Sequence, residues 1–253
     1  MKRALIGHTG FVGSNLLKQT HFDDLYNSKN IESIQGHAYD LLVIAGAPAA
    51  KWLANKEPDK DLDNIQRLCD SLKEVSAKQV LLISTIDVYP EPFAVDEKTT
   101  IHKALCHPYG KHRLFLEKFV AERFNCKVLR LPGLFGDGLK KNVIFDYLHH
   151  HEIEKIDTRN EFQFYFLKNL WGDCQKFLEL KMPLLNLSCE PIPTGLVAEI
   201  CLGKELHNPV LQNPIHYDVH SCYADQLGGK DGYCYTLHDV MRHLKTYVKD
   251  FKH

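Results

Sequence analysis

The stretch ALIGHTGFVGSNLLKQ, residues 4–19, decides the fold of this chain. Its apolar first half predicts a short buried strand, and its second half predicts a helix that begins near Ser14. Gly7, Gly10 and Gly13 then occupy the turn between them, where glycine permits positive φ and lets a ligand approach the backbone closely. A pyrophosphate at such a turn is held by backbone N–H groups and the helix dipole. The stretch favours a dinucleotide-binding turn, with a turn that merely connects the two elements as the alternative.

Three further apolar runs, at 40–46, 79–85 and 126–133, alternate with segments of helical spacing at 14–19, 62–77 and 109–124. Strands that are apolar throughout and alternate with helices indicate a parallel sheet covered on both faces. The predicted fold class is therefore α/β, a doubly wound, Rossmann-type parallel sheet in a dinucleotide-binding domain over residues 1–136. Prolines interrupt the pattern afterwards, so residues 137–253 are expected to form a smaller C-terminal substrate lobe, interleaved with returning sheet elements around 160–190.

Composition excludes several classes of protein. The chain has 253 residues and a formal net charge of −1, which favours neither nucleic acid nor an anionic membrane as partner. No apolar run approaches the roughly 18 residues of a membrane span, and the apolar start is too short for a signal peptide, so we expect a cytoplasmic protein. The eight cysteines form no CxxC pair and three adjacent histidines on a helix point apart, so no metal site is predicted.

One strand end carries groups suited to catalysis. The segment LLISTIDVYP places Ser84, Thr85 and Asp87 at the carboxyl end of a buried strand. Open α/β sheets bind their ligands at that edge. A hydroxyl there can hold a substrate oxygen, and Asp87 is a candidate base, with a solvated carboxylate as the alternative.

A second segment, HPYGKHRLFLEKF, supplies a phenol and a cation. Tyr109 lies at the start of a predicted helix, and Arg113 follows four residues later on the same face. A fixed cation stabilises a phenolate, so we expect the pKa of Tyr109 to fall towards neutrality. Tyr109 would then exchange a proton with a substrate hydroxyl while hydride passes between carbon and a nicotinamide.

Over about the first 175 residues these motifs resemble the extended short-chain dehydrogenases/reductases, which act mostly on nucleotide-linked sugars. GHTGFVGSNL is similar to their cofactor turn, YGKHRLFLE to their Tyr-xxx-Lys helix, and STIDVYP to their hydroxyl-bearing strand end, with Thr85 at the catalytic position. The resemblance also implies a small apolar loop near the cofactor in LLVIAGAPA and a further conserved segment in RLPGLFGDGL. With the glycine turn, it implies these cofactor-binding residues: Gly7, Thr9, Gly10, Phe11, Val12, Gly13, Ala45, Gly46, Ala47, Leu131 and Pro132.

Three departures qualify the resemblance. Arg113 stands where the family has a lysine that contacts the nicotinamide ribose, and a planar guanidinium is no like-for-like substitute for an amine. Thr85-Ile86-Asp87 replaces the Thr-Asp-Glu of the sugar dehydratases, so a standard 4,6-dehydratase is disfavoured. The predicted substrate lobe is also shorter than that of a typical sugar epimerase.

The residues after the second strand bear on the choice of nicotinamide. If that strand ends around Tyr26, then Asn27, Ser28 and Lys29 lie next to the adenosine ribose and suit a 2′-phosphate. If it ends earlier, an acidic residue of FDDLY would bind the ribose diol of NAD. We favour NADP, with NAD as the alternative.

The substrate is indicated less directly. The resembling enzymes grip the nucleotide or phosphate of their substrate near the positions of Lys140, Lys141 and Asn142. We therefore predict an NAD(P)-dependent oxidoreductase or epimerase of a nucleotide-activated sugar. The resemblance implies a homodimer. The alternatives are a catalytically degenerate NAD(P)-binding protein that serves as redox sensor or assembly partner, and a reductase of a non-sugar carbonyl.

Overall fold

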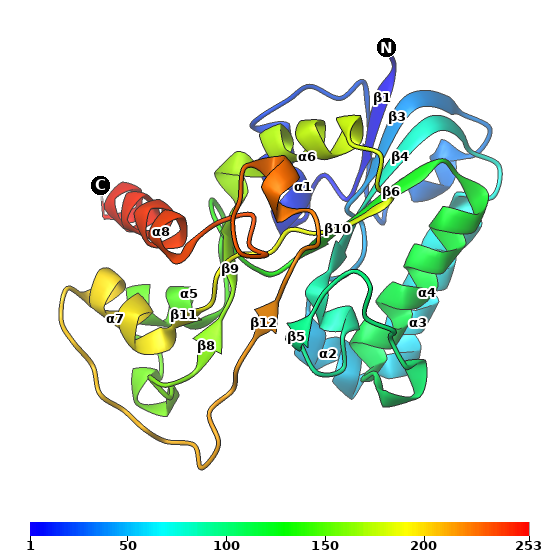
Figure 1. Ribbon diagram of the computed structural model, residues 1–253. Coiled ribbons are helices and arrows are strands. Elements are labelled where there is room, and N and C mark those ends of the chain that lie inside the picture. Colours follow the sequence, from blue (N-terminus) through cyan, green and yellow to red (C-terminus); the bar gives the residue numbers. More distant parts are fainter. Residues whose placement is uncertain (253) are drawn as a thin grey trace. The chain divides into compact units, whose positions relative to one another are not determined.

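The computed structural model describes residues 1–252, which divide into two compact units (Figure 1). The first unit comprises Met1–Glu91, Thr99–Leu131 and Leu170–Leu185. The second comprises Pro92–Lys98, Pro132–Asn169 and the chain from Asn186 onward. None of the helices in this described part is both long and apolar enough to cross a membrane.

The first unit is built on a six-stranded sheet in the order β10-β6-β4-β3-β1-β2. The pairings from β2 across to β6 are all parallel. The central strands are buried on both faces, which is why they read as unbroken apolar runs in the sequence. The predicted doubly wound α/β fold is confirmed, and the strand bounds are β1 Arg3–Ile6, β2 Asp24–Tyr26, β3 Ala38–Ile44, β4 Ser76–Thr85, β6 Cys126–Leu131 and β10 Leu184–Asn186.

Helices cover both faces of this sheet, with α3 and α4 on one face and α1 and α6 on the other (Figure 1). Alternate residues of β1 and β3 pack with the apolar stripes of α3 and α4 in one core. Proline occupies the first turn of both α3 and α4, where its missing N–H removes no helical hydrogen bond. The bounds are α1 Phe11–Leu17, α2 Lys51–Lys56, α3 Pro58–Ser71, α4 Pro108–Arg123 and α6 Leu170–Glu179, with 3₁₀ turns η1 Ile31–Ile34, η2 Ile86–Val88 and η3 Lys103–Leu105.

The second unit has three two-stranded pairs, β7 with β9 and β5 with β12 in parallel and β8 with β11 antiparallel. A capping box between Thr236 and Asp239 begins its last helix, α8. The bounds are β5 Phe93–Val95, β7 Gly133–Phe135, β8 Glu161–Phe162, β9 Phe164–Phe166, β11 Ile192–Pro193, β12 Asp218–Val219, α5 Val143–Leu148, α7 Thr194–Leu202 and α8 Leu237–Phe251, with 3₁₀ turns η4 Ile153–Lys155, η5 Leu167–Asn169 and η6 Ala224–Leu227.

Candidate active site

The strand order places a ligand crevice at one edge of the first unit. β1 lies between β2 and β3, so the chain leaves β1 towards one side of the sheet and returns on the other. Ligands of open α/β sheets bind outside the carboxyl ends of the strands at such a reversal. The loops that follow β1, β3 and β4 therefore form the candidate site.

The turn after β1 is packed so closely that two of its glycines are obligatory. Gly7 has φ +89°, and a Cβ there would lie 2.3 Å from the carbonyl oxygen of Ala45. A Cβ on Gly13 would lie 2.1 Å from the carbonyl oxygen of Gly7. Gly10 is the N-cap of α1 and offers no side-chain cap, so the helix start is left to its backbone N–H groups. This turn fits the pyrophosphate of a dinucleotide.

The flanking residues predicted to bind the cofactor have different exposures. Thr9 and Gly46 are exposed, whereas Leu131 and Pro132 are buried. Those of intermediate exposure are Phe11, Val12, Ala45 and Ala47. In the second unit, Lys140 and Lys141 are exposed, while Asn142 caps α5 by accepting hydrogen bonds from two backbone N–H groups.

Strand β2 ends at Tyr26 and not earlier, so the residues that follow the strand are Asn27, Ser28 and Lys29. The backbone N–H of Gly7 donates to the carbonyl oxygen of Tyr26 at 2.7 Å, so the residues directly after Tyr26 lie beside the glycine turn. Asn27 lies 3.1 Å from the His8 ring, measured from Nδ2 to Nε2, and both Ser28 and Lys29 are exposed.

The acidic residues Asp23, just before β2, and Asp24, its first residue, are engaged at the opposite end of the strand. Asp24 binds the Lys2 ammonium at 2.9 Å, and Asp23 accepts a 2.7 Å hydrogen bond from the backbone N–H of Arg3. Neither carboxylate is therefore at the carboxyl edge, where a ribose diol would lie.

The structure brings Tyr109, Thr85 and Arg113 together, as the sequence predicted. The Thr85 hydroxyl lies close enough to the Tyr109 phenol to act on its pKa. The Arg113 guanidinium carbon lies 4.2 Å from the centre of the Tyr109 ring, so the cation stacks on the ring face. Tyr109 is only 7% exposed.

The predicted fall in the pKa of Tyr109 is wrong for the free protein. Burial raises the pKa of the Tyr109 phenol above its ordinary value, because desolvation penalises the phenolate. The Arg113 charge and the Thr85 hydroxyl act in the expected direction but do not outweigh burial. The phenol is therefore protonated at neutral pH.

Arg113 has two anchors that the sequence did not reveal. Its guanidinium forms two bonds to the Asp61 carboxylate, Nη1 to Oδ2 at 2.7 Å and Nη2 to Oδ1 at 3.1 Å, and also donates to the carbonyl oxygen of Pro48. Asp61 also accepts from Nδ1 of His112 at 2.8 Å. Asp61 precedes Ile65 by four residues on the buried stripe of α3, and an acid on such a stripe is the signal that could have identified it.

The start of helix α4 fixes the position of Tyr109. The Tyr109 N–H donates to Oδ1 of Asn55 at 3.0 Å, and Nδ1 of His107 accepts from the Gly110 N–H at 3.2 Å. Burial lowers the pKa of His107, which suits an unprotonated acceptor. A Cβ on Gly110 would lie 2.4 Å from the carbonyl oxygen of Asp87, so glycine allows α4 to approach η2.

The other two predicted catalytic residues have partners of their own. Asp87 forms a 2.7 Å ion pair with Lys51 of α2, at the same end of β4. Ser84 donates to the buried Glu117 carboxylate at 2.5 Å. Because side chains alternate along a strand, Ser84 and Thr85 point to opposite faces of the sheet.

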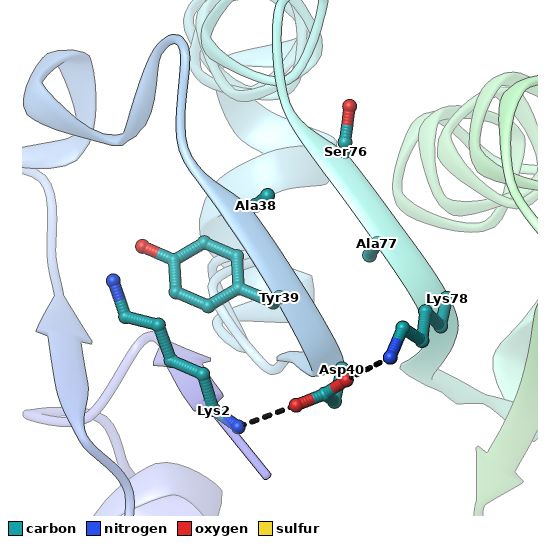
Figure 2. A pocket seen from close by; sticks show the side chains of 7 residues that line it. All are labelled: Lys2, Ala38, Tyr39, Asp40, Ser76, Ala77 and Lys78. Carbon is teal, nitrogen blue, oxygen red and sulfur yellow. Dashed lines mark hydrogen bonds and ion pairs between the residues drawn. The ribbon is translucent and has the colours of Figure 1, made fainter.

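A shallow hollow of about 350 Å³ lies at the other edge of the sheet, at the amino ends of β3 and β4 (Figure 2). Asp40 accepts from the Lys2 backbone N–H and pairs with Lys78, each at 2.6 Å. The charged groups of this hollow therefore neutralise one another. The hollow lies at the opposite end of β4 from Thr85. Within residues 1–252 no group of three or more His, Cys, Asp or Glu could hold a metal, and all eight cysteines are free thiols.

Neither a protein-family profile nor a curated protein sequence matches this chain. Solved structures do. A UDP-glucose 4-epimerase from Thermotoga maritima, solved with UDP-glucose, aligns over 100% of this chain and 99% of its own at 15% identity and TM-score 0.74. A dTDP-4-dehydrorhamnose reductase from Clostridium acetobutylicum aligns over 100% of both chains at 14% identity and TM-score 0.74.

RMD from Pseudomonas aeruginosa, solved with NADPH, aligns over 99% of this chain and 100% of its own at 16% identity and TM-score 0.72. At these identities the likeness establishes the fold and not the activity. The chain therefore shares its fold with these epimerase and reductase structures, and the predicted doubly wound α/β architecture agrees with theirs.

Proposed function

We propose that this protein is an NADP-dependent reductase or epimerase of a nucleotide-activated sugar, with Tyr109 as general acid/base. The observation that carries the proposal is the convergence of the Tyr109 phenol, the Thr85 hydroxyl and the Arg113 guanidinium at the carboxyl end of β4, in the sheet whose glycine turn fits a dinucleotide. Solved structures of the same fold include a UDP-glucose 4-epimerase and a dTDP-4-dehydrorhamnose reductase.

In this mechanism Gly7, Gly10 and Gly13 would hold the dinucleotide, and its nicotinamide would supply or accept the hydride. Thr85 orients the substrate oxygen and Tyr109 transfers its proton. Because burial keeps the phenol protonated, the site is ready to donate a proton to a developing alkoxide.

Two features of the structure support NADP over NAD. The residues that follow Tyr26 are Asn27, Ser28 and Lys29, which offer amide, hydroxyl and ammonium donors to a 2′-phosphate. The two acids at the start of this strand, Asp23 just before it and Asp24 within it, are engaged at its other end. Fluorescence titration should give a lower Kd for NADPH than for NADH, and Lys29→Ala should weaken NADPH alone. Equal weakening of both cofactors would contradict this role for Lys29.

The decisive experiment compares Tyr109→Phe with the wild type. We expect NADPH binding to persist, while turnover with dTDP-4-dehydrorhamnose or another nucleotide-linked keto sugar falls by about 10²–10⁴-fold. Thr85→Val should lower turnover in the same assay. Ser84→Ala should lower it less, because the Ser84 hydroxyl donates its hydrogen bond to Glu117. Full activity of Tyr109→Phe, or a wild type that binds no nicotinamide nucleotide, would overturn the proposal.

One observation favours the second candidate, a cofactor-binding protein without turnover. The Arg113 charge is paired with Asp61, and burial outweighs it in setting the pKa of Tyr109. If tight NADPH binding is accompanied by no hydride transfer across a panel of nucleotide sugars, the sensor role is favoured. Transfer to a simple ketone or aldehyde but to no sugar would instead favour the non-sugar reductase.

A further inference from the structure

A buried charge cluster adjoins the candidate active site and involves residues that the proposed mechanism leaves without a role. It consists of Asp61 on α3 with His112 and Arg113 on α4, all of them buried. We propose that Asp61 is a positioning residue: it holds the Arg113 guanidinium over the Tyr109 ring and sets how much of its positive charge acts on the phenol. The catalytic meaning of this inference rests on the proposed role of Tyr109.

The geometry leaves Arg113 little freedom. Both carboxylate oxygens of Asp61 accept from the guanidinium, and the Pro48 carbonyl oxygen accepts a further N–H. Asp61 and Arg113 are only 5% and 3% exposed, so water does not loosen the pair. Bidentate pairing fixes both the position and the plane of a guanidinium. The clamp therefore dictates the 4.2 Å stacking on Tyr109.

The same clamp neutralises the cation that it positions. Burial alone would raise the pKa of Asp61, but hydrogen bonds from Arg113 and His112 outweigh it and hold that pKa below its usual range. Asp61 is therefore a carboxylate, and its negative charge offsets the guanidinium beside the phenol. An amine in place of Arg113 would have neither the two-point contact with Asp61 nor the stacking plane.

Other charged groups near Tyr109 do not duplicate this role. Asp87 of η2 acts on the phenol and opposes Arg113, but it is paired with Lys51 of α2. His107 caps α4 through an unprotonated ring nitrogen. Arg113 is thus the cation that acts on the phenol, and Asp61 is the anion bound to it.

The test measures the ionisation of Tyr109 in the free protein by NMR of ¹³Cζ-labelled tyrosine, with the resonance assigned by its loss in Tyr109→Phe. Asp61→Asn keeps an oxygen acceptor for Arg113 but removes the negative charge, so the pKa of Tyr109 should fall by about 1–3 units. Arg113→Gln should raise it. Asp70→Asn, an exposed change on the same helix, is the matched control and should leave it unchanged.

A fourth variant keeps the proposal testable if Asp61→Asn alone does not fold. Asp61→Asn with Arg113→Gln removes both charges while retaining hydrogen-bonding amides. The expected order of Tyr109 pKa, from lowest to highest, is Asp61→Asn, wild type, the double variant and Arg113→Gln. Comparing the last two isolates the Asp61 charge.

The inference would be overturned if the Tyr109 pKa is unchanged in folded Asp61→Asn, or if it is the same in the double variant and in Arg113→Gln. Asp61 would then only connect α3 to α4. Because no cofactor or substrate is needed, this outcome is separable from the fate of the proposed function. If the enzyme is active, the pH dependence of kcat/KM should move with the measured pKa in each variant.

Discussion

Replacing Glu117 with glutamine should destabilise the first unit more than a single hydrogen bond would suggest. Glu117 of α4 binds Arg130 of β6 at two points, Oε1 to Nε at 3.0 Å and Oε2 to Nη2 at 2.6 Å. Ser84 of β4 donates to the same carboxylate, and Arg130 also donates to the Tyr89 hydroxyl at 3.0 Å. As whole residues, Glu117 and Arg130 are 8% and 5% exposed.

The magnitude follows from the buried cation that the change leaves behind. Removing one partner of a buried ion pair costs about 3–5 kcal/mol, because the other charge stays desolvated without compensation. Glutamine retains one oxygen acceptor, so we expect a loss near the lower end, about 3 kcal/mol. For a chain of this size each kcal/mol corresponds to about 2–4 °C, so Tm should fall by about 6–12 °C.

Equilibrium urea unfolding followed by far-UV circular dichroism measures the loss. The matched control is Glu122→Gln on the same helix, where the exposed ion pair with Lys118 spans 3.6 Å and the expected change is within about 0.5 kcal/mol. The double variant Glu117→Leu with Arg130→Met removes both charges and should recover at least half of the lost stability.

Two results would refute this reasoning. A loss below about 1 kcal/mol for Glu117→Gln would mean that the Arg130 charge is not trapped in the folded state. A double variant as unstable as the single one would mean that packing, and not the unpaired charge, supports the contact between α4 and β6.

Three further changes have expected outcomes. Gly13→Ala should abolish NADPH binding in a fluorescence titration, because its Cβ would lie 2.1 Å from the Gly7 carbonyl oxygen. Asp157→Asn should destabilise the fold at pH 7, since bonds from Arg159 hold the Asp157 pKa well below its usual value. Because the pKa of Asp157 is lower in the folded than in the unfolded protein, the loss of unfolding free energy in Asp157→Asn should be greatest above the unfolded-state pKa of about 4. The loss should become smaller as the pH falls below that value. Lys127→Met should cost about 1–3 kcal/mol in the same unfolding assay, because the part-buried Leu180 and buried Met182 carbonyl oxygens lose their ammonium donor.

Each of these has its own contrary outcome. Gly172→Ala in α6, where a Cβ meets nothing within 4 Å, should leave cofactor binding intact, and equal loss in both glycine variants would deny a specific role to the turn. A stability difference for Asp157→Asn that stays constant down to pH 3 would contradict the linkage. Unchanged stability in Lys127→Met would show that water replaces the ammonium group.

The sequence predicted element types better than their ends. Apolar spacing predicted a helix through 62–77, but α3 runs from Pro58 to Ser71 and β4 begins at Ser76. Val75 keeps the helical spacing yet lies in the turn before β4, because a buried turn residue and a helix residue on the core face are equally apolar. Proline at the first helical turn was the available start signal.

By itself the sequence determined the doubly wound sheet, the glycine turn and the strand end that carries Thr85. Each of these follows from local pattern: apolar runs set the strands, glycine spacing sets the turn, and the carboxyl ends of parallel strands converge on one edge. These features need no knowledge of which distant side chain lies behind another.

Only the tertiary structure decided how the site is charged. Asp61 and Arg113 are 52 residues apart in the chain, and nothing local in either helix specifies that pairing. The direction of the Tyr109 pKa likewise depends on how completely packing removes water from the phenol, which outweighs the nearby cation. Desolvation and ion pairing depend on all the residues that surround a group in the folded chain. The sequence pattern does not specify those neighbours, so it could not predict the electrostatics of the site.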